Sequence, residues 1–248
     1  MDFDKIFRLP PTRRIYNAFP YRQKDEAQVL YVEGCKAVFD RTIFYAESGG
    51  QTFDTGTIEG CKVNNVQKIL GEYKVVKNPR CANVPSVKVN TRIVHEFDHE
   101  PAFTPGQTVV MKIDWERRYK IMKNHTLCHF LYYGITEAFA HHNEDLFLKG
   151  CAIDEVKGGF SLNNGIDNDL FEEIKGRVCS SYLTPSEITM TPEPSNDEVF
   201  YWECNGIVIP CGGTHIENTS ELAEFQISKK SGGKGKTKIY IAEKSQDR

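Results

Sequence analysis

The stretch DWERRYKIMKNHTLCHF, residues 114–130, divides the chain into two kinds of sequence. From Asp114, a residue type that often caps helices, apolar residues return every three or four positions and predict a helix to about Ala140. Before Asp114, short alternating or β-branched runs separated by turn residues predict strands at 28–32, 36–39, 55–58, 73–76, 91–94 and 108–113. Residues 1–114 are therefore expected to form a small N-terminal β-barrel domain.

The remainder of the chain mixes helix and strand patterns. Leu170, Ile174 and Val178 repeat at four-residue spacing and predict a second helix over 168–182. Apolar runs predict strands at 207–209, 222–227 and 238–241, and the prolines around residues 185–194 predict an exposed loop. We expect residues 115–248 to form one α+β domain, so the fold class of the whole chain is α+β.

Two pairs of metal-binding residue types stand far apart in the sequence. His125 and His129 lie four positions apart on the predicted helix, so both imidazoles can face one point. Cys211 and His215, in the segment CGGTH, repeat this spacing around two glycines that allow a tight loop. Neither pair is persuasive alone, because HxxxH arises often by chance and a lone cysteine usually behaves as a small apolar residue. Together they predict a tetrahedral zinc site.

Composition narrows the class of protein. The chain has 248 residues, 40% of them hydrophobic, and a formal net charge of −3. No apolar run approaches the roughly 18 to 20 residues that span a bilayer, and Met1–Lys5 lacks the order of a signal peptide. We therefore expect a cytoplasmic protein whose eight cysteines are mostly reduced thiols.

One local patch is strongly basic. Five lysines occur within ten residues around the segment SGG, at Lys229, Lys230, Lys234, Lys236 and Lys238. They predict a cationic loop for a phosphate backbone, and the alternative is a solvated hairpin tip. The segment GKGKT within it imitates a nucleotide P-loop, but a lysine replaces the first glycine of that motif and a strand pattern follows. This excludes ATP binding and predicts chemistry independent of ATP.

Four segments, in chain order, carry a specific resemblance. They are Asp40–Gln51 (DRTIFYAESGGQ) with Asp54–Gly56, Gly106–Arg118 leading into Asn124–Thr126, Cys211–His215, and Gly233–Lys236 before Ile239 and Tyr240. Over residues 28 to 243 the chain resembles the editing region of alanyl-tRNA synthetases. Because no sequence remains for an aminoacylation domain, it is similar to the free-standing alanyl-tRNA editing proteins of the AlaX family.

The resemblance implies both a fold and an activity. The fold is a small β-barrel followed by an α+β zinc domain shared with threonyl-tRNA synthetases. The activity is hydrolysis of the ester that joins serine, or sometimes glycine, to tRNA-Ala, with the acceptor end of the tRNA as partner. Such a second sieve is needed because an alanine pocket discriminates against these amino acids by only about 1 to 3 kcal/mol. Zinc could polarise the ester, activate water or anchor the substrate, and the sequence leaves these roles open.

The resemblance also implies roles for single residues. The zinc ligands are His125, His129, Cys211 and His215, and the lysines of the basic patch contact tRNA. The expected catalytic residues are Gln51, His125 and His215. The expected substrate contacts are Gly49, Gly50, Gln51, Cys128, Leu148 and Cys151.

The chain departs from the family pattern in its amino-acid pocket. Cys128 stands where a small residue or Thr is usual, and Leu148–Cys151 replaces a segment with hydroxyl or amide groups, which makes the pocket more apolar. At 156–160 a glycine bend replaces a charged strand. Two alternatives follow: a zinc-stabilised tRNA-binding or regulatory module that has lost hydrolysis, or a deacylase for another mischarged tRNA, such as seryl-tRNA-Thr.

Overall fold

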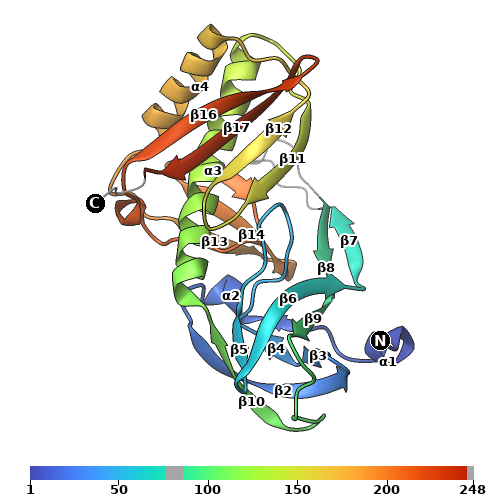
Figure 1. Ribbon diagram of the computed structural model, residues 1–248. Coiled ribbons are helices and arrows are strands. Elements are labelled where there is room, and N and C mark those ends of the chain that lie inside the picture. The colour runs from blue at the N-terminus through green and yellow to red at the C-terminus, as the bar shows by residue number, and fades with distance from the viewer. Residues whose placement is uncertain (76–85, 245–248) are drawn as a thin grey trace. The chain divides into compact units, whose positions relative to one another are not determined.

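The computed structural model describes residues 1–75 and 86–244, and these residues form many strands and few helices (Figure 1). They fall into two compact units. The first comprises 1–118, 190–202 and 210–214, and the second comprises 119–189, 203–209 and the chain from 215 onward. The domain boundary expected between residues 114 and 115 stays a prediction.

Within the described residues, no helix has the length and apolar character needed to cross a membrane.

Six strands of the first unit close into a barrel in the order β10-β2-β3-β9-β6-β5 (Figure 1). They are β2 (Lys24–Glu33), β3 (Lys36–Phe39), β5 (Gly56–Ile58), β6 (Cys61–Ile69), β9 (Arg92–Phe97) and β10 (Thr108–Ile113). Side chains alternate between the interior and the outside, so Val109, Met111 and Ile113 of β10 are all buried. The sequence pattern misses β6 because a bulge after Val63 breaks the two-residue alternation.

Gly56 allows β5 to meet β10, the pairing that closes the barrel. Its φ is +153°, and a Cβ atom there would lie 2.2 Å from the carbonyl oxygen of Lys112 and 2.7 Å from the Cα of Ile113. A side chain at this position would push the two strands apart. The glycine of the Asp54-Thr55-Gly56 segment is therefore required by the barrel itself.

Short elements surround the barrel. These are α1 (Phe3–Phe7), β1 (Arg13–Arg14), α2 (Ile15–Ala18), β4 (Arg41–Thr42), β7 (Glu72–Val75) and β8 (Ser86–Val89). Strand β1 pairs with β4, and β7 pairs with β8. The strand expected at 73–76 corresponds to β7, while Val76 lies outside the described residues.

A buried ion pair anchors the first turn of the long helix within the first unit. Arg118 and Asp54 have almost no exposed surface, and Arg118 Nε donates to Asp54 Oδ1 at 2.9 Å. The guanidinium also donates to the carbonyl oxygens of Ile43 at 2.7 Å and Pro20 at 2.9 Å. The carboxylate accepts from the Tyr45 amide at 2.6 Å. Each charge is thus both paired and hydrogen-bonded, the condition under which burial of charge is tolerated.

The loop expected around the prolines is instead the start of a hairpin. Strands β13 (Thr189–Glu193), β14 (Asn196–Cys204) and β15 (Ile207–Pro210) form a three-stranded sheet in that order. Pro192 is accommodated because β13 is an edge strand, where a missing amide donor leaves no ladder bond unmade. The expectation of an irregular loop was wrong over this stretch for that reason.

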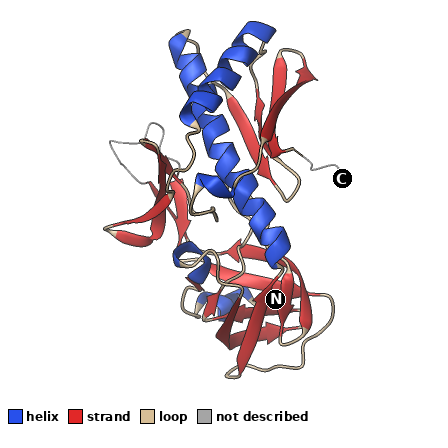
Figure 2. Cartoon of the chain, turned by 90° about the vertical axis from the view of Figure 1, so that its left-hand side faces the viewer, coloured by secondary structure: helices blue, strands red, loops and turns tan. Residues whose placement is uncertain are grey.

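The second unit packs two helices on one face of a four-stranded sheet (Figures 1 and 2). The helices are α3 (Trp115–His141) and α4 (Asn168–Ser181), close to the predicted bounds, and a short 3-10 turn (Thr219–Glu221) precedes β16. The sheet order is β11 (Leu148–Ile153), β12 (Gly158–Leu162), β17 (Lys236–Glu243) and β16 (Phe225–Gly233). A Cβ at Gly134 of α3 would lie 2.6 Å from Val178 Cγ2 of α4, so this glycine permits the close helix packing.

The glycine bend expected at 156–160 is confined to the turn before β12. The Asp154 amide donates to the Lys157 carbonyl at 3.0 Å, and the strand begins at Gly158. A Cβ at Gly158 would lie 2.2 Å from the Cys128 sulfur. The glycine therefore lets β12 lie directly on α3, which is why this segment is a strand despite its composition.

Candidate metal centre and its surroundings

Three buried histidines of the second unit form one cluster. His125 and His129 lie one turn apart on α3, and His215 follows the CGGT segment. The ring centroids are 4.9 Å apart for His125 and His129, 4.1 Å for His125 and His215, and 4.4 Å for His129 and His215. One ring nitrogen from each lies within 4.8 Å of those of the other two. The helix face predicted from the spacing is therefore the face that meets His215.

The environment keeps these imidazoles neutral. Burial lowers the pKa of His125 to about 3. It also lowers the pKa of His129 and His215 well below the usual value, and the neighbouring histidines lower both further. A neutral imidazole is the form that coordinates a metal ion.

A threonine that the sequence analysis did not single out orients His215. Thr126 Oγ1 of α3 lies 3.1 Å from His215 Nδ1, and both residues are fully buried. A hydrogen bond to one ring nitrogen fixes the tautomer and the direction of the other. The sequence contained one signal for such a contact, because a threonine stands directly beside a histidine in both segments. These are Thr126 after His125 and Thr214 before His215.

Cys211 belongs to the first unit, where its loop is held by backbone contacts. Its amide donates to the Phe200 carbonyl at 2.9 Å, and its sulfur accepts from the Gly213 amide at 3.3 Å. Asn17 Nδ2 donates to the Gly212 carbonyl at 3.0 Å. Since four residues of extended chain span at most about 14 Å, the covalent chain alone keeps this thiol near His215. Its part in the ligand set remains a prediction.

Gln51 is fully buried, and its amide is engaged with the CGGTH loop of the first unit. Its Nε2 donates to Thr214 Oγ1 at 2.9 Å, and its Oε1 accepts from the Thr214 amide at 3.0 Å. Gly49 and Gly50, with φ of 60° and 88°, form the tight turn expected before it. These contacts make Gln51 a positioning residue for the loop, and its expected catalytic role stays a prediction.

The expected pocket residues lie in two environments. Cys128 is buried beneath Gly158, and its thiol hydrogen-bonds with that of Cys151. Burial raises the pKa of Cys128 well above the usual value, whereas the hydrogen bond from Cys128 lowers the pKa of Cys151. Leu148, by contrast, is 40% exposed at the start of the edge strand β11. The structure thus brings Cys128 and Cys151 together, while Leu148 lies at the surface.

Comparisons with known proteins match segments of both units to families of tRNA synthetases. Residues 11–117 match the family model of class II (A) tRNA synthetases, and residues 203–240 match that of the threonyl and alanyl tRNA synthetase second additional domain. The alanyl-tRNA editing protein AlaX-M of Pyrococcus horikoshii is 27% identical over 93% of this chain and 97% of its own length. The chain is thus a relative of the alanyl-tRNA editing proteins.

Alanine–tRNA ligases are similar over one part of their length. The ligase of Aeropyrum pernix is 30% identical and that of Sulfurisphaera tokodaii 31% identical, over 89% and 90% of this chain. The chain spans about a quarter, 25%, of each ligase. The resemblance to the editing family read from the four segments is confirmed, and the second matched region contains both the CGGTH loop and the whole of the basic patch.

The basic patch of this editing-protein relative lies on a β-hairpin, whose register shifts between Ser231 and Gly233. Strands β16 and β17 join through a tight turn at Lys234 and Gly235, whose φ values are 49° and 72°. Lys229 points inward, donating its ammonium to the carbonyl oxygens of Ile166, at 3.1 Å, and Asp167. The other four lysines of the patch are exposed.

Lys68 of the first unit is a further polar group that the sequence analysis missed. Burial, followed by repulsion from Arg14, lowers the pKa of its ammonium to about 7. The ammonium lies 5.5 Å from the centre of the Tyr45 ring. It lies on β6, the strand whose alternation is broken, so no periodic signal marked it.

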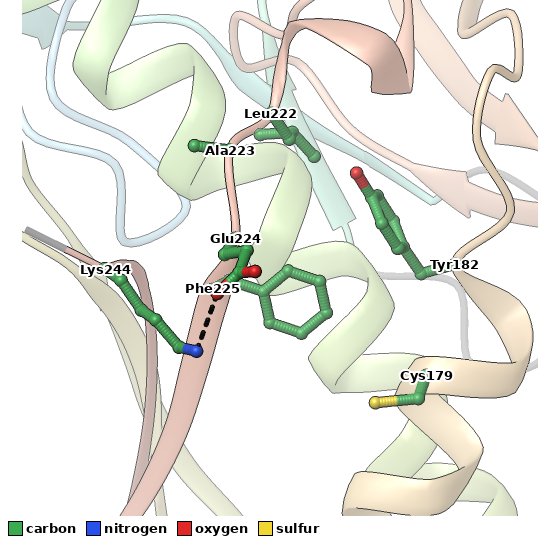
Figure 3. Close-up of a pocket in the computed structure, with 7 residues that line it drawn as sticks. All are labelled: Cys179, Tyr182, Leu222, Ala223, Glu224, Phe225 and Lys244. Atoms are coloured by element: carbon green, nitrogen blue, oxygen red, sulfur yellow. Dashed lines mark hydrogen bonds and ion pairs between the residues drawn. The ribbon is translucent and has the colours of Figure 1, made fainter. Parts of the chain in front are cut away.

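A surface hollow elsewhere in the second unit contains none of the predicted site residues. It is lined by Cys179 and Tyr182 at the end of α4 and by residues 222–225 and Lys244 (Figure 3). Two of these residues form an ion pair, with Lys244 Nζ 2.8 Å from Glu224 Oε2. Its walls hold no cluster of metal-ligand residues, so the histidine cluster remains the candidate centre.

Proposed function

We propose that the chain is a zinc-dependent hydrolase that deacylates mischarged tRNA-Ala, with a serine or glycine ester as substrate. The observation that supports this proposal most directly is the buried cluster of three neutral imidazoles. It occurs in a chain that aligns with nearly the whole length of an alanyl-tRNA editing protein. Its partner is the acceptor end of the tRNA, and its effect is to maintain the fidelity of translation.

The donor set fits zinc. Three imidazoles and one thiolate are the ligand types that this ion prefers, and the Cys211 sulfur already accepts an amide hydrogen bond, as a thiolate does. The proposed ligands are His125, His129, Cys211 and His215. When bound, zinc would polarise the ester carbonyl or lower the pKa of water. Four protein ligands fill a tetrahedron, so a direct catalytic role requires one ligand to yield or the coordination to expand.

The remaining residues position the centre and the substrate. Thr126 orients His215, and Gln51 holds Thr214 and thereby the loop that carries Cys211. Gly49 has no atom within 4 Å of the place a Cβ would occupy, so the backbone of this turn can approach the ester closely. The paired thiols of Cys128 and Cys151 give the amino-acid pocket a less polar wall. This favours glycine over serine as the amino acid removed.

Hydrolysis of defined aminoacyl-tRNAs tests the proposal. Purified protein is incubated with tRNA-Ala charged with serine, glycine or alanine, and with tRNA-Thr charged with serine. His125→Ala removes a proposed ligand, and His99→Ala is the matched control, because His99 is exposed and pairs with Asp98 at 2.6 Å. We expect rapid loss of glycine or serine from tRNA-Ala, abolished by His125→Ala together with bound zinc and unchanged in His99→Ala.

Two other results have definite meanings. Preferential hydrolysis of seryl-tRNA-Thr would change the proposed substrate to the tRNA of the threonyl-tRNA synthetase, which the matched domain also names. No metal-dependent hydrolysis of any pair, with zinc still bound, would contradict the deacylase and leave a zinc-stabilised tRNA-binding module.

A further inference from the structure

A second group of metal-binding side chains lies where α3 ends. Among the described residues, two groups of histidine, cysteine or carboxylate side chains bring three or more donor atoms within 4.8 Å of one another. The first includes the three buried histidines described above, and the second comprises His141, His142 and Glu173. All three members of the second group belong to the second unit, so the group is complete within it.

The carboxylate of Glu173 contacts the two histidines through separate oxygens. His141 Nδ1 lies 2.9 Å from Oε1, and His142 Nε2 lies 2.8 Å from Oε2. Ligand atoms that surround one zinc ion at bond lengths of about 2.1 Å are separated by roughly 3.0 to 3.4 Å. Small side-chain rotations are therefore enough to place an ion between the three groups.

The end of α3 fixes the backbone that carries the two histidines. The Asn143 amide donates to the Ala140 carbonyl at 3.1 Å, and the Glu144 amide donates to the Phe139 carbonyl at 3.0 Å. Asn143 has a φ of 52°, in the left-handed region. These features form the Schellman motif, which ends a helix in a defined conformation. Both histidines are thus attached to ordered backbone.

The third donor comes from the neighbouring helix. Glu173 lies within α4, which runs beside α3 (Figures 1 and 2) and packs closely on it at Gly134. Arg177, one turn further along α4, donates to Glu173 Oε1 from Nε at 2.8 Å and from Nη2 at 2.6 Å. A ligand that is itself hydrogen-bonded is oriented before the metal arrives. Arg177 therefore holds the carboxylate in its place between the histidines.

Solvent reaches this group directly. The His141 and His142 side chains are 64% and 46% exposed, and that of Glu173 is 25% exposed. An ion can therefore enter without any opening of the fold. The Arg177 guanidinium adds a positive charge beside the ion, so we expect weaker binding than at the buried histidine cluster.

We propose that His141, His142 and Glu173 form a second metal site, which takes a divalent transition metal ion such as zinc and links the end of α3 to α4. Two imidazoles and one carboxylate suit ions of this class. On binding, each ring nitrogen that faces the carboxylate gives its lone pair to the ion, and the proton of the neutral ring lies on its other nitrogen. Three protein ligands leave a position for water, as in an open site. This proposal does not rest on the proposed function.

Equilibrium dialysis of the full chain against zinc tests the site. The wild type should bind one ion at the buried cluster and a further, weaker ion at the second site. Glu173→Gln and His142→Ala should each weaken the second ion by at least about tenfold and leave the first unchanged. Thermal unfolding without added metal establishes that each variant is folded.

Two controls remove similar side chains elsewhere on the surface. Glu172→Gln removes the neighbouring carboxylate of α4, which pairs with Lys175 at 2.9 Å. His99→Ala removes an exposed histidine that pairs with Asp98 at 2.6 Å. Both controls should bind zinc as the wild type does, because neither residue belongs to the second site.

Paramagnetic cobalt(II) locates the ion in NMR spectra. It should broaden the amide signals around His142 and those around Glu173 together, and this broadening should disappear in Glu173→Gln. About 18 Å of helix separate His129 from His141, at 1.5 Å per residue, so the effects of an ion at the buried cluster are distinguishable. Broadening confined to the α3 side would overturn the shared site.

Two results of the dialysis would also overturn the proposal. Equal zinc binding by Glu173→Gln and the wild type would leave only a pair of surface histidines. Absence of a second ion in the wild type would leave an ion-pair network around Glu173. His125→Ala separates this question from the proposed function, because it should lose the first ion and keep the second whether or not the chain hydrolyses aminoacyl-tRNA.

Discussion

The first unit buries opposite charges, whereas the second buries three groups of the same kind. Arg118 and Asp54 neutralise each other inside the first unit, and surrounding backbone groups complete their hydrogen bonds. His125 disfavours protonation of His129, and His125 and His129 both disfavour protonation of His215. The charges of the first arrangement satisfy each other, while the second presents nitrogen lone pairs that the proposed zinc ion would accept.

Breaking the buried ion pair should produce the largest loss of stability. Arg118→Ala leaves the Asp54 carboxylate buried and unpaired, and should lower the free energy of unfolding by about 3 to 5 kcal/mol. Arg177→Ala removes a more exposed pair with Glu173, at 2.6 Å, and should cost less than about 1 kcal/mol. Urea denaturation of both variants measures the difference. Equal losses would show that Arg118 and Asp54 contribute no more than a surface pair.

The barrel closure is the next feature to test. Gly56→Ala places a methyl group against the backbone of β10 and should destabilise the protein by about 3 kcal/mol. Gly60→Ala is the matched control, because its φ is also positive, +82°, but no atom lies within 4 Å of the added carbon. It should cost about 1 kcal/mol. Similar shifts in the urea midpoint would mean that the positive φ of residue 56, and not its close contact with β10, requires glycine there.

Removal of the Thr126 hydroxyl, which contacts His215, should have a smaller effect than the two changes above. Thr126→Val keeps the shape of the side chain but loses the contact with His215, and should weaken zinc affinity by about tenfold. Thr126→Ser retains the hydroxyl and should restore the affinity. Competition with a zinc-binding dye measures both variants. Weakening in Thr126→Ser equal to that in Thr126→Val would assign the role to the lost methyl group.

The smallest effect is expected at the exposed end of the second unit. Hydrogen bonds from Arg177, then His142 and His141, lower the pKa of Glu173 from 4.5 to about 2. Because the folded pKa is depressed, its contribution to stability is present above pH 4.5 and is lost as the pH falls toward 2. Glu173→Gln should therefore slightly flatten the acid dependence of the unfolding midpoint in this window. An unchanged acid limb would show that solvent screens these contacts.

Local pattern was enough to predict several elements. Strands 36–39 and 108–113 and the long helix were predicted almost to the residue, because alternation and three-to-four spacing are properties of consecutive positions. The same periodicity placed His125 and His129 on one helical face. Strands β6 and β12 escaped prediction because a bulge and two glycines interrupt their patterns.

The sequence by itself determined the residue types of the candidate site, the two helices and the relationship to editing proteins, since each is carried by short segments. Only the tertiary structure decided that Gln51 pairs with Thr214, that Thr126 orients His215, and that Lys229 lies on the side of β16 that contacts the Ile166 carbonyl. The reason is physical: these choices depend on strand register and on contacts between residues as many as 163 positions apart, which no local periodicity records.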